Sequence, residues 1–303
     1  MGRVLITGGA GFIGSHLTER LVKKGYDVIV LDNLLRGKAE NISHVMQSIN
    51  FVEGDIRDYE LIHSLIKNVD AVIHLAAISR VQPCMENPEL CLDVNVKGTE
   101  IIARICSKYK KKMIFASSRE VYGNPKYLPV DEDHPLNPEN PYGASKVSAE
   151  SIIREYSKSY GLEYVVLRLT NVYGFGDFDR VIPIFIERSL KNEDLILYGK
   201  DKILDFVYIS DVTAAFIKAL EINEGGLILN IGSGIGTKLI DLANLIKRLI
   251  RSSSNIVLQE NKKGEAERFI ADITKAREFL KWQPRVSLNN GISKTIEAII
   301  NNK

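Results

Sequence analysis

The 303-residue sequence has few of the residues that mark secreted or metal-binding proteins. It contains three cysteines, an odd number without C-x-x-C spacing, and five histidines without the spacing of metal ligands. Disulfide frameworks and zinc motifs need paired or regularly spaced residues. We therefore expect reduced thiols, no metal site and a cytoplasmic location. The first predicted strand begins at residue 3, so we also expect no cleaved signal segment.

Long apolar runs and a strong net charge are also missing. No apolar stretch reaches the ~18 residues that a membrane-spanning helix needs. The 40 Lys and Arg residues nearly balance the 38 Asp and Glu residues, for a formal net charge of +2. Such a balance supplies no broad basic surface for nucleic acid or anionic lipid. We therefore expect neither nucleic acid nor membrane as a partner.

A glycine-rich turn near the start is the most informative stretch. An apolar run at residues 4–6 is followed by the turn, and an amphipathic helical pattern covers residues 15–22. The turn fits both G-x-G-x-x-G and the wider T-G-x-x-G-x-x-G spacing, through Gly8, Gly9, Gly11 and Gly14. A strand, a tight turn and a helix N-terminus together can bind a pyrophosphate through free backbone N–H groups.

An acidic residue at the end of the second apolar run indicates which dinucleotide binds there. Residues 26–31 lead into Asp32, 18 residues after Gly14. A carboxylate at this position accepts hydrogen bonds from the adenosine ribose and repels the additional phosphate of NADP. Asp32 could instead be an ordinary loop acid. The agreement of strand, turn, helix and spacing favours NAD.

The rest of the chain continues the alternation of strand and helix up to about residue 170. Further strands are predicted at 49–55, 71–77, 113–118 and 163–169, with helices at 59–67, 88–109 and 142–160. This order predicts a Rossmann-type, doubly wound parallel sheet over residues 1–170. The alternation loosens beyond it. We predict a smaller C-terminal α/β substrate-binding domain at 171–303, with part of 205–235 returning to the first domain.

A tyrosine and a lysine one helical turn apart are the candidate acid–base pair. A nearby ammonium lowers the pKa of a tyrosine hydroxyl, which can then accept a proton during hydride transfer. The pattern Y-x-x-x-K occurs at 122–126, 142–146 and 198–202. Pro125 interrupts the first and Gly199 the third. Only the middle pair, Tyr142 and Lys146, opens a long amphipathic helix. Ser118 ends the fifth predicted strand, at the edge where such sheets bind ligands, and could hydrogen-bond the reacting oxygen.

These motifs together resemble the extended short-chain dehydrogenases that act on nucleotide sugars, and among them most closely the UDP-glucose 4-epimerases. The resemblance covers essentially the whole chain. It is carried by residues 7–14, 32–33, 54–56, 74–77, 95–99, 117–118, 121–123, 141–146, 168–171, 205–208, 230–234 and 271–276.

The resemblance implies a role for each matching residue. Tyr142 is the base, Lys146 lowers its pKa and holds the nicotinamide ribose, and Ser118 orients the sugar hydroxyl. The implied NAD contacts are Gly8, Gly11, Phe12, Ile13, Gly14, Asp32, Asn33, Arg36, Gly37, Asp55, Ile56, Leu75, Ala76, Ala77, Asn95, Tyr142, Lys146 and Thr170. The implied substrate contacts are Ser118, Glu120, Asn171, Lys202, Lys262, Arg268 and Phe269. The implied assembly is a homodimer.

Three departures from the family pattern leave alternatives open. Leu204 stands where the family often has an arginine, and the family's Arg-Pro-Gly-Asp segment reads Lys-Lys-Gly-Glu at 262–265. Lys202, Lys262 and Arg268 are therefore substitutes for the diphosphate contact. Glu120 occupies the position of a catalytic glutamate in related decarboxylases and 4,6-dehydratases. It could equally be a structural carboxylate paired with Arg119. We expect a UDP-hexose 4-epimerase, with a nucleotide-sugar decarboxylase or dehydratase as the alternative.

Overall fold

The computed structural model describes residues 2–199, 201–260 and 267–301. The described residues form two compact units. The first contains residues 1–123, 135–169 and 213–229, and the second contains 124–134, 170–212 and 230–303. The segment 213–229, which lies within the 205–235 stretch, thus belongs to the first unit.

The first unit is built on a seven-stranded sheet. Its strands are β1 (Arg3–Thr7), β2 (Asp27–Asp32), β3 (Ile49–Glu53), β4 (Ala71–His74), β5 (Lys112–Ser118), β6 (Tyr164–Leu169) and β10 (Leu227–Ile231). They lie in the order β10-β6-β5-β4-β1-β2-β3. The pairs β1–β2, β1–β4, β2–β3, β4–β5 and β5–β6 are parallel. The predicted doubly wound sheet is confirmed, and its strand order reverses between β1 and β4.

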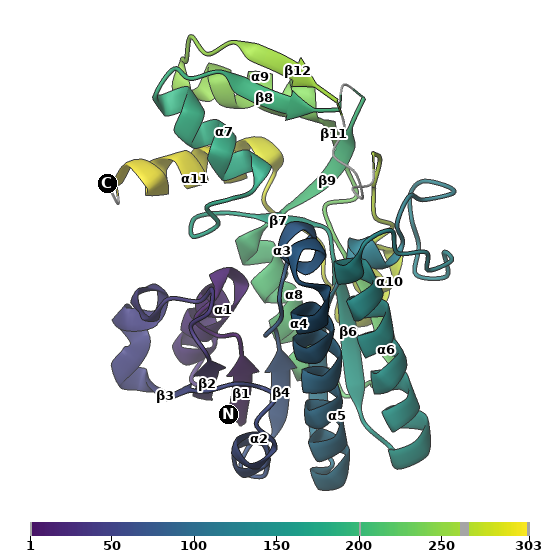
Figure 1. Cartoon of the computed structure of the whole chain (residues 1–303). Coiled ribbons are helices and arrows are strands. Elements are labelled where there is room, and N and C mark those ends of the chain that lie inside the picture. The colour runs from purple at the N-terminus through teal and green to yellow at the C-terminus, as the bar shows by residue number, and fades with distance from the viewer. Residues whose placement is uncertain (1, 200, 261–266, 302–303) are drawn as a thin grey trace. The chain divides into compact units, whose positions relative to one another are not determined.

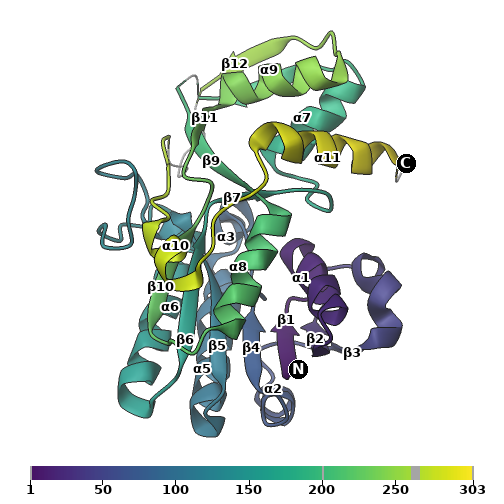
Figure 2. The ribbon, with the colours of Figure 1, turned by 180° about the vertical axis from the view of Figure 1, so that it is seen from behind.

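Helices cover both faces of this sheet (Figures 1 and 2). One face carries α4 (Pro88–Leu92), α5 (Gly98–Tyr109) and α6 (Pro141–Tyr160), and the other carries α1 (Phe12–Lys23) and α8 (Ile209–Glu221). The remaining helical segments are η1 (Ala39–Ser48), α2 (Tyr59–Ile66), α3 (Val81–Glu86), η2 (Asp93–Lys97) and η3 (Arg119–Val121). Apolar residues of the strands and of α2, α5 and α6 form one core.

The helix predicted at 88–109 contains an irregular turn. The segment η2 is π-helical and joins α4 to α5. Such π turns occur mostly as single insertions within α-helices, frequently at functional sites. This one carries Asn95.

The expectation of reduced thiols is wrong for two of the three cysteines. Cys84 of α3 and Cys91 of α4 form a disulfide, with their Cα atoms 5.2 Å apart. Asn87 interrupts the helix, since it ends α3 and caps α4, and residues seven apart in sequence lie close together across this break. Cys106 is free and buried, and burial raises the pKa of its thiol.

The second unit has two small sheets. Strand β9 (Ile203–Tyr208) lies between β7 (Asn171–Tyr173), which is parallel to it, and β11 (Gly236–Lys238), which is antiparallel. Strands β8 (Leu195–Tyr198) and β12 (Ile256–Gln259) form a parallel pair. Its helices are α7 (Val181–Leu190), α9 (Leu239–Ile250), α10 (Thr274–Leu280) and α11 (Leu288–Asn301). Apolar residues of α7, α9, α11 and the strands form a second core.

Candidate active site

The turn between β1 and α1 is built so closely that only glycine fits at two of its positions. Gly8 has a φ of +74°, in the left-handed region that favours glycine. A Cβ atom on Gly14 would lie 2.1 Å from the carbonyl oxygen of Gly8. Gly11 precedes α1 as its N-cap, and Phe12 and Ile13 begin the helix. The turn thus brings the helix N-terminus to the end of β1, at the point where the strand order reverses, as dinucleotide binding requires.

Asp32, at the end of β2, is held in a fixed orientation by backbone groups. Its carboxylate accepts hydrogen bonds from the backbone N–H groups of Ala10 and Leu34, each at 2.9 Å. Burial raises the pKa of Asp32, and these two bonds oppose the shift. Each oxygen keeps further acceptor capacity for ribose hydroxyls. Of the loop residues predicted to contact NAD, Arg36 is exposed and Gly37 is buried.

The end of β3 carries a second oriented carboxylate. The Asp55 side chain accepts from Arg57 Nε and Nη2 at 2.9 Å and from Asn33 Nδ2 at 3.2 Å. Arg57 also pairs with Asp93 at 2.6 Å. The Arg57 guanidinium holds the pKa of Asp55 below its usual value. Arg57 therefore orients Asp55, next to Ile56. Its role was not predicted, because a single arginine two residues after an acid gives no distinct signal.

The turn after β4 packs directly against the glycine turn. A Cβ atom on Gly8 would lie 2.7 Å from the backbone nitrogen of Ala76. His74, just before Leu75, is fully buried and hydrogen-bonds Thr7 Oγ1 at 2.7 Å and Thr99 Oγ1 at 3.0 Å. Burial, with a smaller effect of Lys146, lowers the pKa of His74 to about 3. His74 is therefore a neutral structural residue, and small side chains (Ala76, Ala77) follow it.

Asn95 links the turn after β4 to the start of α6. Its Oδ1 accepts from the backbone nitrogen of Ile78 at 2.8 Å, and its Nδ2 donates to the carbonyl of Ile78 and to Ser145 Oγ. Ser145 Oγ in turn donates to the carbonyl of Tyr142 at 2.7 Å. The structure places Asn95 as a connection between two predicted cofactor-binding segments.

Tyr142 and Lys146 lie one turn apart on α6, beside β5. The Lys146 Nζ atom donates to the carbonyl of Ala116 at 2.9 Å and lies 4.6 Å from the Phe115 ring centroid and 5.9 Å from the Tyr142 ring centroid. Burial lowers the pKa of Lys146 to about 7, and the Glu150 carboxylate opposes this shift. Ser118 ends β5, and its Oγ accepts from the backbone nitrogen of Glu120 at 3.2 Å.

Glu120 is buried and both of its carboxylate oxygens are engaged. Its Oε1 pairs with Arg119 Nη2 at 2.9 Å, and its Oε2 accepts from Asn140 Nδ2 at 3.0 Å. Asn140 is also the N-cap of α6, because its Oδ1 accepts from the backbone nitrogen of Gly143 at 2.8 Å. Sequence reasoning missed this cap, although an asparagine followed by a proline is a recognisable helix start.

Two predicted site residues begin the second unit. Thr170 is buried, and its Oγ1 has no hydrogen-bond partner within the described residues. A buried hydroxyl of this kind is a polar atom that a bound ligand can satisfy. Asn171 starts β7 and donates to the carbonyl of Asp205 at 2.9 Å.

Two predicted substrate contacts, Arg268 and Phe269, lie beside Ile203 at the start of β9. The Phe269 nitrogen donates to the carbonyl of Ile203 at 2.9 Å, and Arg268 forms a bridge with Ile203. Phe269 is buried and Arg268 is exposed. Lys262 lies outside the described residues.

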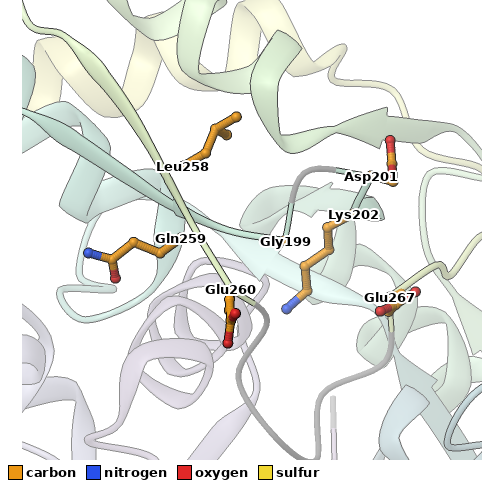
Figure 3. A pocket seen from close by; sticks show the side chains of 7 residues that line it. All are labelled: Gly199, Asp201, Lys202, Leu258, Gln259, Glu260 and Glu267. Carbon is orange, nitrogen blue, oxygen red and sulfur yellow. The ribbon is translucent and has the colours of Figure 1, made fainter.

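Lys202 lines a pocket of about 860 Å³ in the second unit (Figure 3). The side chains of Lys202 and Glu260 extend toward the same side of this pocket, and that of Asp201 extends the other way. The described lining consists of Gly199, Asp201, Lys202, Leu258, Gln259, Glu260 and Glu267. Three carboxylates therefore accompany one ammonium.

The first unit fits NAD on its own geometry. The closely packed glycine turn and the N-terminus of α1 have the geometry that a pyrophosphate site needs, and the oriented Asp32 has acceptor atoms suited to a ribose. No helix among the described residues is long and apolar enough to cross a membrane. Within that same part of the chain, no three His, Cys, Asp or Glu side chains gather as a metal site.

Comparisons with known proteins agree with this geometry. The family model described as GDP-mannose 4,6 dehydratase matches residues 5–295. A putative UDP-glucose 4-epimerase of Methanocaldococcus jannaschii is 43% identical, covering 99% of each chain. A UDP-N-acetyl-alpha-D-glucosaminuronate decarboxylase of Bacillus cytotoxicus is 36% identical, covering 97% of each. The solved structure of the Thermus thermophilus UDP-glucose 4-epimerase in complex with NAD has a TM-score of 0.92 and 34% identity, covering 99% of this chain and 100% of that one.

The glycine turn, the oriented Asp32, the Tyr142–Lys146 pair and the family match over residues 5–295 lead to one assignment. The chain belongs to the GDP-mannose 4,6-dehydratase-like family of short-chain dehydrogenases, which comprises NAD-dependent nucleotide-sugar epimerases, dehydratases and decarboxylases.

Proposed function

We propose that this chain interconverts UDP-glucose and UDP-galactose by epimerisation at C4. The observation that carries the proposal is the state of Glu120, which is paired with Arg119 and hydrogen-bonded by Asn140. A carboxylate engaged in this way serves the geometry of the site. The acid–base work is then left to Tyr142 and Lys146, and a 4-epimerase needs no more than that. The similarity to a putative UDP-glucose 4-epimerase over 99% of the chain supports the same choice.

Each site residue then has one role. Bound NAD would supply reversible hydride acceptance, and the glycine turn and Asp32 would hold it. The Tyr142 phenolate accepts the proton of the C4 hydroxyl and returns it after the 4-keto sugar has rotated to present its other face. Lys146 stabilises the tyrosinate electrostatically and binds the nicotinamide ribose. Ser118 donates a hydrogen bond to the reacting C4 oxygen.

Substrate binding is proposed on the same basis. Asn171, Lys202, Lys262, Arg268 and Phe269 contact the UDP-hexose, with the lysines and Arg268 supplying charge to the diphosphate. Lys202 is buried and adjoins three carboxylates. The acids that line this pocket repel a diphosphate, so the contact depends on the lysine ammonium, which supplies a point charge without the two-pronged geometry of arginine.

A nucleotide-sugar decarboxylase is the second candidate, and the presence of Glu120 favours it. A decarboxylase of Bacillus cytotoxicus is 36% identical to this chain. Loss of carbon dioxide requires a further group that gives a proton to C5. Loss of water requires further groups that remove the C5 proton and protonate the leaving hydroxyl. Arg119 cannot protonate a leaving group at neutral pH, because a guanidinium does not give up its proton.

One assay separates the two candidates. The purified protein is incubated without added NAD with UDP-glucose, UDP-galactose, UDP-glucuronate and dTDP-glucose, and the products are resolved by NMR. For the epimerase, Glu120→Gln keeps the interconversion within about tenfold of the parent, or ~1.4 kcal/mol on the barrier. The exposed Glu139→Gln is the matched control. Release of carbon dioxide from UDP-glucuronate, or a 4-keto-6-deoxy product, contradicts the proposal.

The remaining expectations concern assembly and location. We propose a homodimer formed through the helical segment 88–109 and α6, where Leu92 and Tyr160 expose large apolar side chains. Light scattering that returns the monomer mass of 33.9 kDa at micromolar concentration contradicts this. The proposed location is the cytoplasm.

A further inference from the structure

Helix α6 presents a third ionisable side chain on the face that carries the acid–base pair. Tyr142, Lys146 and Glu150 are spaced four residues apart, so they lie above one another on one side of the helix. Glu150 is 2% exposed and Lys146 is 3% exposed. Two opposite charges therefore occupy the buried end of this row, next to the tyrosine.

Glu150 is fixed by an arginine from the sheet. Arg168 of β6 reaches it with two parallel hydrogen bonds, Nε to Oε1 at 3.0 Å and Nη2 to Oε2 at 2.6 Å. Arg168 is 3% exposed. A two-pronged arginine–carboxylate pair sets orientation as well as distance. The pair therefore fixes the rotation of α6 about its own axis relative to β6.

Two further hydrogen bonds complete the network. Ser117 of β5 donates to Glu150 Oε1, and Arg168 Nη1 donates to the Tyr122 hydroxyl at 2.8 Å. Ser117 and Tyr122 are buried. Well-packed apolar residues often stabilise a fold as well as a buried ion pair does, so stability alone is a weak explanation for these charges.

The charges around Lys146 show what the network can do for the site. The ionisable groups facing its ammonium are Tyr142 and Glu150 on α6 and His74 on β4, and Arg168 lies beyond Glu150. The other contacts are the Phe115 ring and the carbonyl of Ala116. His74 is neutral at physiological pH, so it adds no charge there. Glu150 is the anion that opposes the effect of burial on Lys146.

We propose that Glu150, held by Arg168, is a positioning residue that aligns the Tyr142 and Lys146 face of α6 with the sheet and supplies the counter-charge that keeps the Lys146 ammonium protonated. The proposal rests on the assignment of Tyr142 and Lys146 as the acid–base pair. It does not depend on which nucleotide sugar is turned over.

The test compares two variants of the NAD-loaded protein with a matched control. Glu150→Gln removes the counter-charge but leaves Arg168 buried and unpaired, which can prevent folding. The double variant Glu150→Gln/Arg168→Met removes both charges and keeps the side-chain volume nearly constant, so it retains the fold. Glu155→Gln removes an exposed carboxylate from the same helix and is the control.

The first readout does not require turnover. The protonation of Lys146 is followed by NMR of protein labelled on its lysine side chains, with the signal assigned through Lys146→Met. We expect Lys146 in the double variant to lose its proton about one pH unit lower than in the parent. The Glu155→Gln protein follows the parent. A folded double variant whose Lys146 titrates like the parent overturns the proposal.

The second readout is the pH profile of kcat on the best substrate of the panel. Loss of the ammonium at lower pH moves the alkaline limb of the profile to lower pH by the same amount. A merely structural role lowers kcat equally at every pH, and that result overturns the proposal. If the protein turns out to be a decarboxylase, only the proposed reaction fails, because the NMR titration is unaffected by the identity of the product.

Discussion

The side chain of Asn140 joins Glu120 to the first turn of α6. Its Nδ2 donates to Glu120 Oε2 at 3.0 Å, while its Oδ1 accepts from the backbone nitrogen of Gly143 at 2.8 Å. Tyr142 is the second residue of that helix. Glu120 is thus connected through Asn140 to the helix turn that carries Tyr142.

Asn140→Ala is therefore expected to affect both stability and turnover. Loss of the cap costs ~1 kcal/mol of stability, and the unsatisfied Glu120 oxygen adds about 1–3 kcal/mol. We expect kcat to fall by at least about tenfold, because a small displacement of a catalytic group strongly lowers the reaction rate. Urea unfolding and initial rates measure the two effects.

A matched control for this change exists in the same unit. Asn87 also precedes a proline, and it caps α4 by accepting from the backbone nitrogen of Leu90 at 3.0 Å. Asn87→Ala removes a cap of the same chemistry and leaves kcat unchanged. Equal losses of kcat in the two variants show that the cap at Asn140 has no special connection to Tyr142.

Tyr142→Phe is expected to remove the proton acceptor and to leave the fold intact. General acid–base catalysis contributes about 10²–10⁴-fold, and kcat falls by that factor. Tyr156→Phe on the same helix removes a hydroxyl that donates to Glu100 at 2.6 Å and serves as the control. Stopped assays with both variants measure the effect. Near-normal turnover by Tyr142→Phe shows that another group is the base.

Asp32 is expected to make the protein prefer NAD over NADP. Its carboxylate is fixed by Ala10 and Leu34, so it cannot turn away from a 2′-phosphate. Asp32→Ala removes the repulsion between the carboxylate and the 2′-phosphate of NADP. The dissociation constants of NAD and NADP then become more similar, as measured by calorimetry on protein freed of nucleotide. Asp27→Asn, at the exposed start of the same strand, leaves the ratio unchanged. Equal affinities in the parent protein contradict the prediction.

The first unit could be predicted from sequence because its signals are local. The run into Gly8, the acid at Asp32 and the helical pattern after Tyr142 each depend on a few neighbouring residues. Six strands of the sheet follow from the order of such segments, whereas the seventh, β10, comes from the 205–235 stretch, in which no strand is predicted. Parallel strands with intervening helices allow few other arrangements.

The connections that hold the site together could not be predicted, because they join distant segments. Glu150 and Arg168 pair only because β6 lies beside α6, and Arg57 bridges acids 38 residues apart (Asp55 and Asp93). The pairing of Cys84 with Cys91 depends on the helix break at Asn87, and a spacing of seven residues does not reveal it. The cap at Asn140 is the connection with the clearest signal in the local sequence, an asparagine followed by a proline.

The buried His74 is expected to make the folded state sensitive to acid. Its pKa is about 3 in the folded protein, against about 6.5 for a histidine in an unfolded chain. Between these values the unfolded chain binds one more proton than the folded one. The free energy of unfolding therefore falls as the pH drops from about 6.5 toward 3, by at most ~1.4 kcal/mol per pH unit from this group.

His74→Gln tests this sensitivity because glutamine does not titrate. At pH 7.5 the variant is less stable than the parent, since the imidazole bonds to Thr7 and Thr99 are lost. Below pH 6.5 the free energy of unfolding of the variant declines less steeply with falling pH than that of the parent. The slopes differ by at most ~1.4 kcal/mol per pH unit, the contribution of one proton. The stability curves of variant and parent therefore converge as the pH falls. Urea unfolding at several values between pH 7.5 and 4 measures the slopes. Parallel curves for His74→Gln and the parent mean that His74 has the same pKa in the folded protein as in the unfolded chain, which its full burial argues against.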